Sequence, residues 1–241
     1  MRIFTAKVIA LAIFYLTSCG GGTQQNQTEE KIEFEIEEPT QEEVPVVFTV
    51  IAINHEVQDW STWKQSYDDR KQTREDAGLK ELDLLRDLDN RNEVMILLRS
   101  KDHASAQDFS SSDDLKASME TAGLDVEPQI WYWDIVQSND AEEANWKYRL
   151  LISHEVRDFS TWKPAFDDHE TVRQEAGINI LGVARDRDKP NLVSIMFAFD
   201  DLEKAQKYAT SEELRIKMDE AGVIGKPGMK WMVVPDQDTI I

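Results

Sequence analysis

The sequence predicts an α+β protein made of two tandem copies of one β-α-β-β-α-β unit. The main observation is a repeated phrase, since HEVQDWSTWKQSYDD begins at His55 and HEVRDFSTWKPAFDD begins at His154, 99 residues later. Over 55–78, 13 of 24 residues are identical to their partners in 154–177. Hydrophobic patterns of the same order follow each copy, which indicates that both units share one architecture.

Each unit begins with an apolar strand rich in β-branched residues, at Val46–Ile53 and at Trp146–Ile152. A helix follows, with Asp59 or Asp158 placed to cap its first turn and a glycine placed to end it. Two strands, a second helical stretch and a last strand complete each unit: 82–86, 94–99, 102–123 and 130–136, then 180–185, 192–199, 200–222 and 229–234. The second helical stretch of the first unit is expected to break near 110–112. This order in about 90 residues is the ferredoxin-like, split βαβ arrangement.

The first 18 residues have the three parts of a secretory signal peptide. Met1–Lys7 carries two positive charges, Val8–Leu16 is an uninterrupted apolar run, and Leu-Thr-Ser leads to Cys19. The run is too short to span a bilayer, which needs about 20 residues. Leu-Thr-Ser-Cys resembles the bacterial lipobox, which implies cleavage before Cys19 and attachment of a lipid to its thiol. The resemblance implies a membrane-anchored lipoprotein of the cell envelope, and Gly20 in place of Asp favours the outer membrane. An ordinary signal peptide with an accidental cysteine is the alternative.

The remaining domain boundaries follow from composition. Residues 19–43 are rich in Gly, Gln and Glu and have no sustained apolar face, which predicts a disordered acidic tether. The two α+β units are then expected at 44–137 and 146–236, with a polar linker at 138–145. The ordered part of the chain is therefore expected to work close to a membrane without being embedded in it.

The charge of the chain excludes one class of partner. The formal net charge is −20, and an acidic surface of this kind repels nucleic acids. The alternative interpretation is that the acidity serves only to keep the protein in solution. With a single cysteine, the chain forms no internal disulfide.

The repeated phrase also carries a family resemblance. His-x-Val-x-Asp-aromatic-x-x-Trp, followed by aromatic-Asp, His, Arg and Ala-Gly, resembles the dimeric α+β barrel superfamily, in particular small antibiotic biosynthesis monooxygenase-like proteins. Residues 154–177 fit better than 55–78, because Arg70 stands where the second unit has His169. Members usually pair two chains, so the resemblance implies that both units close one barrel within a monomer, as an internal pseudo-dimer. Such pairing would bury the face that a lone four-stranded sheet leaves bare.

The superfamily hosts cofactor-free monooxygenases, haem-degrading enzymes, isomerases and proteins without known activity, so the resemblance implies no particular reaction. The residues themselves point to a helix face. Trp162, Phe166, His169 and Arg173 follow at i, i+4, i+7 and i+11, which places them on one side of a helix, and His154 closes the preceding strand. The first unit offers the matching set of His55, Trp63, Tyr67, Arg70 and Arg74.

Facing a cavity, such a set suits a flat or apolar ligand that bears a carboxylate or an enolate. The aromatic side chains would stack on its body, and arginine would pair with its anionic group. The competing interpretation is ordinary core packing, with histidine and arginine reaching past the apolar side chains to solvent.

Three functions remain open from the sequence. The first is a binding module for a small hydrophobic or aromatic anion. The second is a cofactor-independent monooxygenase or isomerase that uses His154, His169 and Arg173, since His169 can titrate near neutral pH whereas Arg70 cannot. The third is a structural or interaction protein without a small-molecule site.

No metal and no cofactor are expected. His55–Glu56 and His154–Glu155 are neighbours in predicted strands, so the two side chains of each pair point to opposite faces and do not chelate one ion. The four histidines match no zinc spacing, and the chain has no nucleotide-binding glycine motif.

Overall fold

The structure, a computed structural model, describes residues 45–121, 127–139 and 145–235. The predicted signal peptide, Cys19 and the tether at 19–43 lie outside the described residues, as does most of the linker predicted at 138–145. Within the described ranges, no helix has both the length and the apolar character that crossing a membrane requires.

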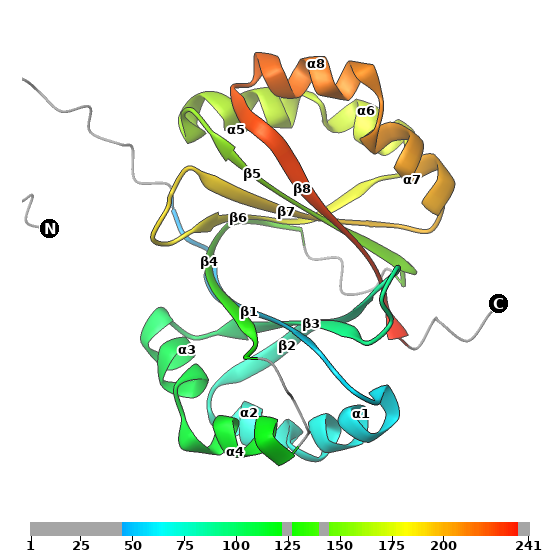
Figure 1. Ribbon diagram of the computed structural model, residues 1–241. Coiled ribbons are helices and arrows are strands. Elements are labelled where there is room, and N and C mark those ends of the chain that lie inside the picture. Colours follow the sequence, from blue (N-terminus) through cyan, green and yellow to red (C-terminus); the bar gives the residue numbers. More distant parts are fainter. Residues whose placement is uncertain (1–44, 122–126, 140–144, 236–241) are drawn as a thin grey trace, which may run out of the picture. The chain divides into compact units, whose positions relative to one another are not determined.

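The chain folds as two halves with the same order of elements (Figure 1). The first half contains β1 (Phe48–Glu56), α1 (Trp60–Asp69), α2 (Lys71–Asp76), β2 (Leu79–Asp87), β3 (Glu93–Ser100), α3 (His103–Ser110), α4 (Asp113–Thr121) and β4 (Gln129–Ser138). The second half contains β5 (Tyr148–Val156), α5 (Phe159–Asp168), α6 (Glu170–Glu175), β6 (Asn179–Asp186), β7 (Leu192–Phe199), α7 (Leu202–Ala209), α8 (Glu212–Glu220) and β8 (Val223–Val233). The predicted α+β class is confirmed.

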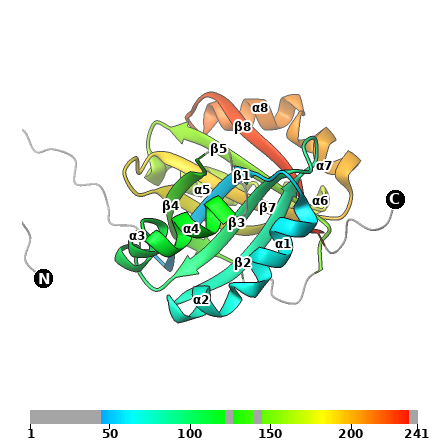
Figure 2. The same ribbon diagram turned by 60° about the horizontal axis from the view of Figure 1, so that its bottom comes forward.

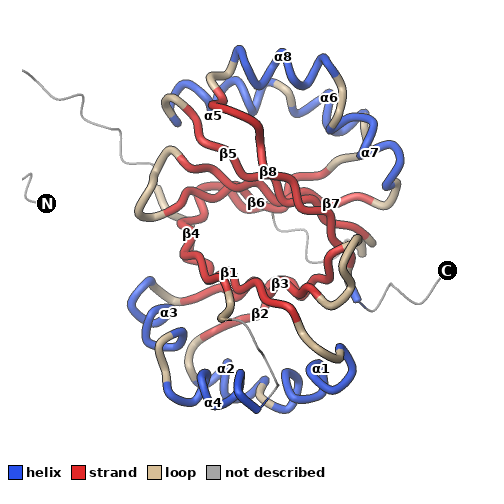
Figure 3. The backbone as a smooth tube through the Cα atoms, viewed as in Figure 1, coloured by secondary structure: helices blue, strands red, loops and turns tan. Residues whose placement is uncertain are grey.

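The eight strands close into one antiparallel barrel, seen as a ring of strands between two layers of helices in Figure 3. The strand order is β1-β3-β2-β8-β5-β7-β6-β4, so the last strand of each half pairs with the second strand of the other half. The predicted intramolecular α+β barrel is thereby confirmed. The two seams differ in length, because β4 and β6 pair from Trp133↔Asp186 to Ser138↔Gly182, whereas β2 and β8 pair only through Arg86↔Val233 and Asp87↔Met232.

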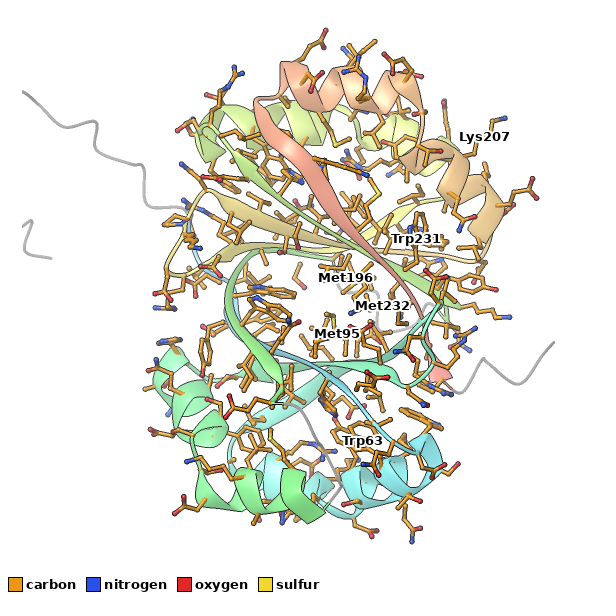
Figure 4. The ribbon with its side chains drawn as sticks, viewed as in Figure 1. Trp63, Met95, Met196, Lys207, Trp231 and Met232 are labelled. Carbon is orange, nitrogen blue, oxygen red and sulfur yellow. The ribbon has the colours of Figure 1, made fainter. Side chains whose placement is uncertain are left out.

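The helices of each half cover the outer face of their own strands. Figure 2 shows α1, α2 and α4 lying over β2 and β3. Two apolar cores lie between helices and strands, one in each half, and a third fills the inside of the barrel. Met95, Met196 and Met232 belong to this third core and lie between the two halves in Figure 4. Each sheet therefore has one face in the barrel and one face under its helices.

Three ion pairs between described residues join the two halves. Arg149 Nε lies 2.7 Å from Asp83 Oδ2, inside the barrel. Arg187 Nη2 lies 2.5 Å from Asp134 Oδ1, and Lys230 pairs with Glu93. In each of these pairs the first half supplies the acid and the second half supplies the base.

The predicted helix boundaries need correction. The first helical stretch of each half is not one helix, because it is interrupted at Arg70 and at His169, where ψ is 13° and 7°. A ψ near zero turns the backbone out of the regular helix for one residue. The stretch predicted at 200–222 likewise divides at Thr210–Ser211, where the Ser211 hydroxyl caps α8. The break predicted near 110–112 is confirmed.

The predicted helix caps are confirmed, and most of the predicted strands were too short. Asp59 Oδ1 accepts a hydrogen bond from Thr62 N, and Asp158 Oδ1 accepts one from Thr161 N, at 2.8 Å in both cases. The strand β1 extends to Glu56, so His55 lies within it, and β8 begins at Val223. As the period of two requires, His55 is buried while Glu56 is exposed.

Candidate functional site

Each half contains a cavity between its helices and the outer face of its strands. In the second half the cavity measures about 60 Å³, and all five predicted residues line it: His154, Trp162, Phe166, His169 and Arg173. In the first half the cavity measures about 80 Å³, and its lining includes the matching five: His55, Trp63, Tyr67, Arg70 and Arg74. The structure thus brings each predicted set together, although the helix that carries it is interrupted.

The interruption of the helix explains how arginine enters each cavity. At the end of α5 the carbonyl of Phe166 accepts a hydrogen bond from Arg173 Nη1 at 2.7 Å, and in the first half Tyr67 O accepts one from Arg74 Nη1 at 2.6 Å. The last carbonyls of a helix have no partner inside it and favour cations. Each guanidinium also lies over the ring of the same residue, 4.0 Å from the centre of Phe166 and 3.6 Å from that of Tyr67.

A stack of rings forms the apolar part of each cavity. In the second half the Trp162 ring lies 4.8 Å from Phe166 and 5.6 Å from His154, measured between ring centres. In the first half the Trp63 ring lies 5.0 Å from Tyr67 and 5.3 Å from His55. The tryptophan is buried in both halves, and Trp63 lies between the helices and the strands in Figure 4. These flat surfaces are suited to an aromatic or apolar body.

The strand histidines are neutral at physiological pH. Burial lowers the pKa of His55 to about 4 and that of His154 to about 4. Neither ring nitrogen of either histidine has a hydrogen-bond partner in the described part of the chain. Because a neutral imidazole has one donor and one acceptor nitrogen, each cavity contains an unused polar group beside its tryptophan.

The arginines differ in what compensates their charge. In the first half Arg74 Nη2 lies 3.8 Å from Glu81 Oε2, and Glu81 also accepts a hydrogen bond from the Tyr67 hydroxyl. In the second half Arg173 is only 3% exposed, and its Nε and Nη2 have no partner among the described residues. Burial lowers the pKa of Arg173, which marks a cation that is poorly solvated where it lies.

The second-half cavity contains further polar groups. None of the described residues that line it is Asp or Glu, and the carboxylates of Asp167 and Glu170 act on Arg173 through their charge alone. The hydroxyl of Tyr208, from α7, and Nδ1 of His169 are both buried there without a partner among the described residues. Lys217, from α8, also lines the cavity, but its ammonium pairs with Glu220 at 2.8 Å. The cavity therefore combines one buried cation and unpartnered polar groups with an aromatic stack, a combination that suits an aromatic anion.

Sequence reasoning missed three residues of these sites. Glu81, Tyr208 and Lys217 do not belong to the repeated phrase, and Glu81 lies on a strand that was expected to begin at residue 82. A signal was present, because at the offset of 99 residues Glu81 corresponds to Ile180 and Tyr208 corresponds to Phe109. These mismatches mark the positions at which the two cavities differ.

A third cavity, of about 200 Å³, lies inside the barrel and was not predicted. Phe48, Leu97, Trp133 and Met196 supply much of its apolar wall, and the buried pair of Asp83 and Arg149 crosses it. Arg149 also donates to the carbonyls of Trp146 and Tyr148, at 2.9 and 3.2 Å. Asp83 and Arg149 are therefore engaged with each other, and Arg149 also with main-chain carbonyls. In the described ranges, no group of three or more His, Cys, Asp or Glu residues is placed to hold a metal ion.

Comparison with known proteins shows the fold. No family model and no curated protein matches the sequence. Among solved structures, a protein assigned as a monooxygenase from Fusobacterium nucleatum has a TM-score of 0.54 at 11% identity, over 78% of this chain and 92% of that one. A protein assigned as a chlorite dismutase has a TM-score of 0.54 at 12% identity, over 79% and 96%.

An anthrone oxidase-like protein matches at a TM-score of 0.54 and 9% identity, over 79% of this chain and 94% of that one. Identities this low leave the side chains of the cavities without a counterpart that could define an activity. What these structures share with the chain is the fold. The chain has the fold of a dimeric α+β barrel, with both ferredoxin-like halves in one polypeptide.

Proposed function

We propose that the chain is a cell-envelope lipoprotein whose second-half cavity binds a small hydrophobic or aromatic anion. The observation that carries the proposal is the buried Arg173, two of whose three guanidinium nitrogens have no partner in the described part of the chain. A buried charge that gains no partner is costly to the folded state, because it loses its hydration. A carboxylate or enolate would supply the missing acceptors in a forked geometry.

The rest of the cavity suits the body of such a ligand. Trp162 and Phe166 present stacked ring faces, and the wall is otherwise formed by aliphatic side chains such as Ile152 and Ile195. A volume of about 60 Å³ corresponds to a few water molecules, which disfavours a large cofactor. A ligand of one ring requires the cavity to widen, since a cavity that binds benzene measures about 150 Å³.

The test uses 4-fluorobenzoate and its uncharged analogue 4-fluorobenzamide, each followed by ¹⁹F NMR titration. Wild-type protein is expected to bind the anion more tightly than the amide. Arg173→Met should weaken 4-fluorobenzoate binding about 10- to 100-fold, because a hydrogen-bonded charge pair is worth about 1.5–3 kcal/mol. The loss should be much smaller for 4-fluorobenzamide.

Two matched variants control for the removal of a positive charge. Arg215→Met removes an exposed cation from the same half, and Arg74→Met removes the corresponding arginine of the first half, which already has Glu81 as partner. Neither variant should weaken the binding of 4-fluorobenzoate. Equal affinities for anion and amide, or an affinity that Arg173→Met leaves unchanged, would show that this cavity is not an anion site. Absence of any binding would favour a structural or interaction role.

A second candidate function is a cofactor-independent monooxygenase or isomerase that uses His154, His169 and Arg173. It is favoured by the fold shared with proteins assigned as monooxygenases and by the neutral, unpartnered imidazole of His154 in the cavity. A base with a pKa of about 4 is weak, so this candidate stands second. Phenylpyruvate, an enolisable aromatic anion, is the probe: enolisation is followed by absorbance and oxygenation by oxygen uptake. Turnover that His154→Phe leaves intact would argue against it.

The proposed location depends on residues 1–19. Their charged start, short apolar run and Leu-Thr-Ser-Cys motif support a lipid anchor at Cys19, with the outer membrane favoured by Gly20. Metabolic labelling with an alkyne fatty acid should mark the wild-type chain and not Cys19→Ser.

The closure of the barrel within one chain supports a monomer, and a stable dimer in sedimentation would indicate that halves exchange between chains.

A further inference from the structure

The two helix–strand cavities share a scaffold and differ in a small set of polar groups. In the first half the set is Tyr67 and Glu81, and the corresponding residues of the second half are Phe166 and Ile180. Glu81 and Ile180 occupy the same place in the fold, since each immediately precedes the register shift of its strand, between Glu81 and Asp83 in β2 and between Ile180 and Gly182 in β6. Differences in backbone position therefore do not account for the difference between the cavities.

In the first half the Glu81 carboxylate acts on two groups of the cavity. It accepts a hydrogen bond from Tyr67, and it lies 3.8 Å from Arg74 Nη2. Burial, and then the hydrogen bond to Glu81, raise the pKa of Tyr67, so the phenol stays protonated and continues to donate. The first-half arginine thus faces an anion that belongs to the chain itself.

In the second half both parts of that arrangement are replaced by hydrocarbon. Phe166 has no hydroxyl to hold a carboxylate, and Ile180 has no carboxylate. The corresponding nitrogen, Arg173 Nη2, is buried and has no partner in the part of the chain that the structure describes. Cavity volumes of about 80 and 60 Å³ are similar, so charge separates the two sites more than size.

We propose that residues 81 and 180 determine the charge of the ligand that each cavity accepts. Glu81 serves as an internal counter-anion, which makes the first-half cavity a site for an uncharged aromatic ligand, and Ile180 leaves the second-half cavity selective for an anion. This inference depends on the anion site proposed above. The anionic group of the ligand lies against Arg173 Nη2, in the place that corresponds to the Glu81 carboxylate of the first half, and its ring lies beside Trp162.

Reciprocal substitutions test the inference with the same two probes, 4-fluorobenzoate and 4-fluorobenzamide. Ile180→Glu should weaken 4-fluorobenzoate binding at least about tenfold, because the new carboxylate competes for Arg173 and repels the ligand. Glu81→Ile should add a second 4-fluorobenzoate site, so that the stoichiometry rises from one to two. That added site should disappear in the double variant Glu81→Ile/Arg74→Met.

Two further variants separate charge from polarity and from misfolding. Ile180→Gln places a polar but uncharged group at a buried position, and Glu81→Gln keeps the length of the side chain. Ile180→Gln should retain more 4-fluorobenzoate affinity than Ile180→Glu, and Glu81→Gln should acquire part of the second site. Folded Ile180→Glu protein that binds 4-fluorobenzoate like the wild type, or folded Glu81→Ile protein that keeps one site, would overturn the inference while leaving the anion site of the second half intact. Wild-type protein that shows no Arg173-dependent binding would contradict the proposed function and overturn this inference with it.

Discussion

The arginine of the first-half cavity is paired with Glu81, whereas the arginine of the second-half cavity has no ion pair with a described residue. Both have a neutral histidine, a buried tryptophan, an aromatic partner and an arginine that folds back on a helix carbonyl. They differ in the partner of that arginine, since Arg74 Nη2 lies 3.8 Å from Glu81 whereas Nε and Nη2 of Arg173 have no hydrogen-bond partner in the described part of the chain. The comparison teaches that the fold places an arginine at the same point in both halves, while the strand residues 81 and 180 decide whether a carboxylate of the chain lies beside it.

The largest effect on stability is expected from the ion pair of Asp83 and Arg149 inside the barrel, which has no counterpart at the positions related by the repeat. At the corresponding positions Arg149 is replaced by Val50 and Asp83 by Gly182. Burial raises the pKa of Asp83, and Arg149 opposes that rise. Arg149→Met should lower the free energy of unfolding by about 3–5 kcal/mol at pH 7, because a buried carboxylate loses its partner. Urea denaturation measures the loss.

The matched control is the double variant Arg149→Met/Asp83→Leu, which removes both charges. It should recover most of the lost stability, since replacing a whole buried pair by apolar residues is often neutral. If the single and the double variant were equally destabilised, the loss would belong to packing and not to charge.

The next largest effect on stability is expected from the buried strand histidine that each half contains. The pKa of His55 and that of His154 are both lowered to about 4 by burial, so the unfolded chain binds protons between pH 6.5 and 4 that the folded chain does not. The contribution of the neutral histidines to the free energy of unfolding is therefore fully present above pH 6.5, and it is lost as the pH falls towards 4. Between pH 7.5 and pH 5 the fall should be about 2 kcal/mol for each histidine.

Substitution of one histidine at a time apportions this acid sensitivity. His55→Phe and His154→Phe should each remove about half of the histidine-dependent fall between pH 7.5 and 5, measured as the free energy of unfolding in urea. A double variant with the full acid sensitivity of the wild type would show that other groups cause it.

The smallest effect is expected at the helix caps, where the halves differ slightly. Both aspartates accept from the backbone N–H and the side chain of a threonine, Thr62 or Thr161, whereas Asp158 accepts in addition from the hydroxyl of Ser160. Replacement of either aspartate by alanine should lower Tm by a few degrees, because one exposed cap contributes little to a chain of this size. Asp158→Ala should lower it more. A larger loss for Asp59→Ala would indicate that the additional hydroxyl partner does not stabilise α5.

Much of the fold could be predicted because its signals are local or repeated. The strand patterns, the aspartate caps and the offset of 99 residues are properties of short segments, and they led to the two halves and to both sets of cavity residues. The breaks at Arg70 and His169 were missed. At each break an arginine side chain, Arg74 or Arg173, donates a hydrogen bond to a carbonyl at the end of the preceding helix, and spacing alone does not reveal this contact. Glu81 was missed for a related reason: its importance arises from a partner on another element.

The ion pairs between the halves have a consequence for assembly. In all three the acid, Asp83, Glu93 or Asp134, belongs to the first half, and the base belongs to the second. Two copies of the first half placed face to face would leave these three carboxylates without cations, because the positions that correspond to Arg149, Arg187 and Lys230 are Val50, Leu88 and Trp131. Two copies of the second half would likewise leave the three cations without carboxylates. If the chain were cut between β4 and β5, the two fragments would therefore be expected to recombine with each other and not with themselves. The distribution of charges thus directs each half to pair with the other. If the two halves were fused to two different molecules, formation of the barrel would report that those molecules had met.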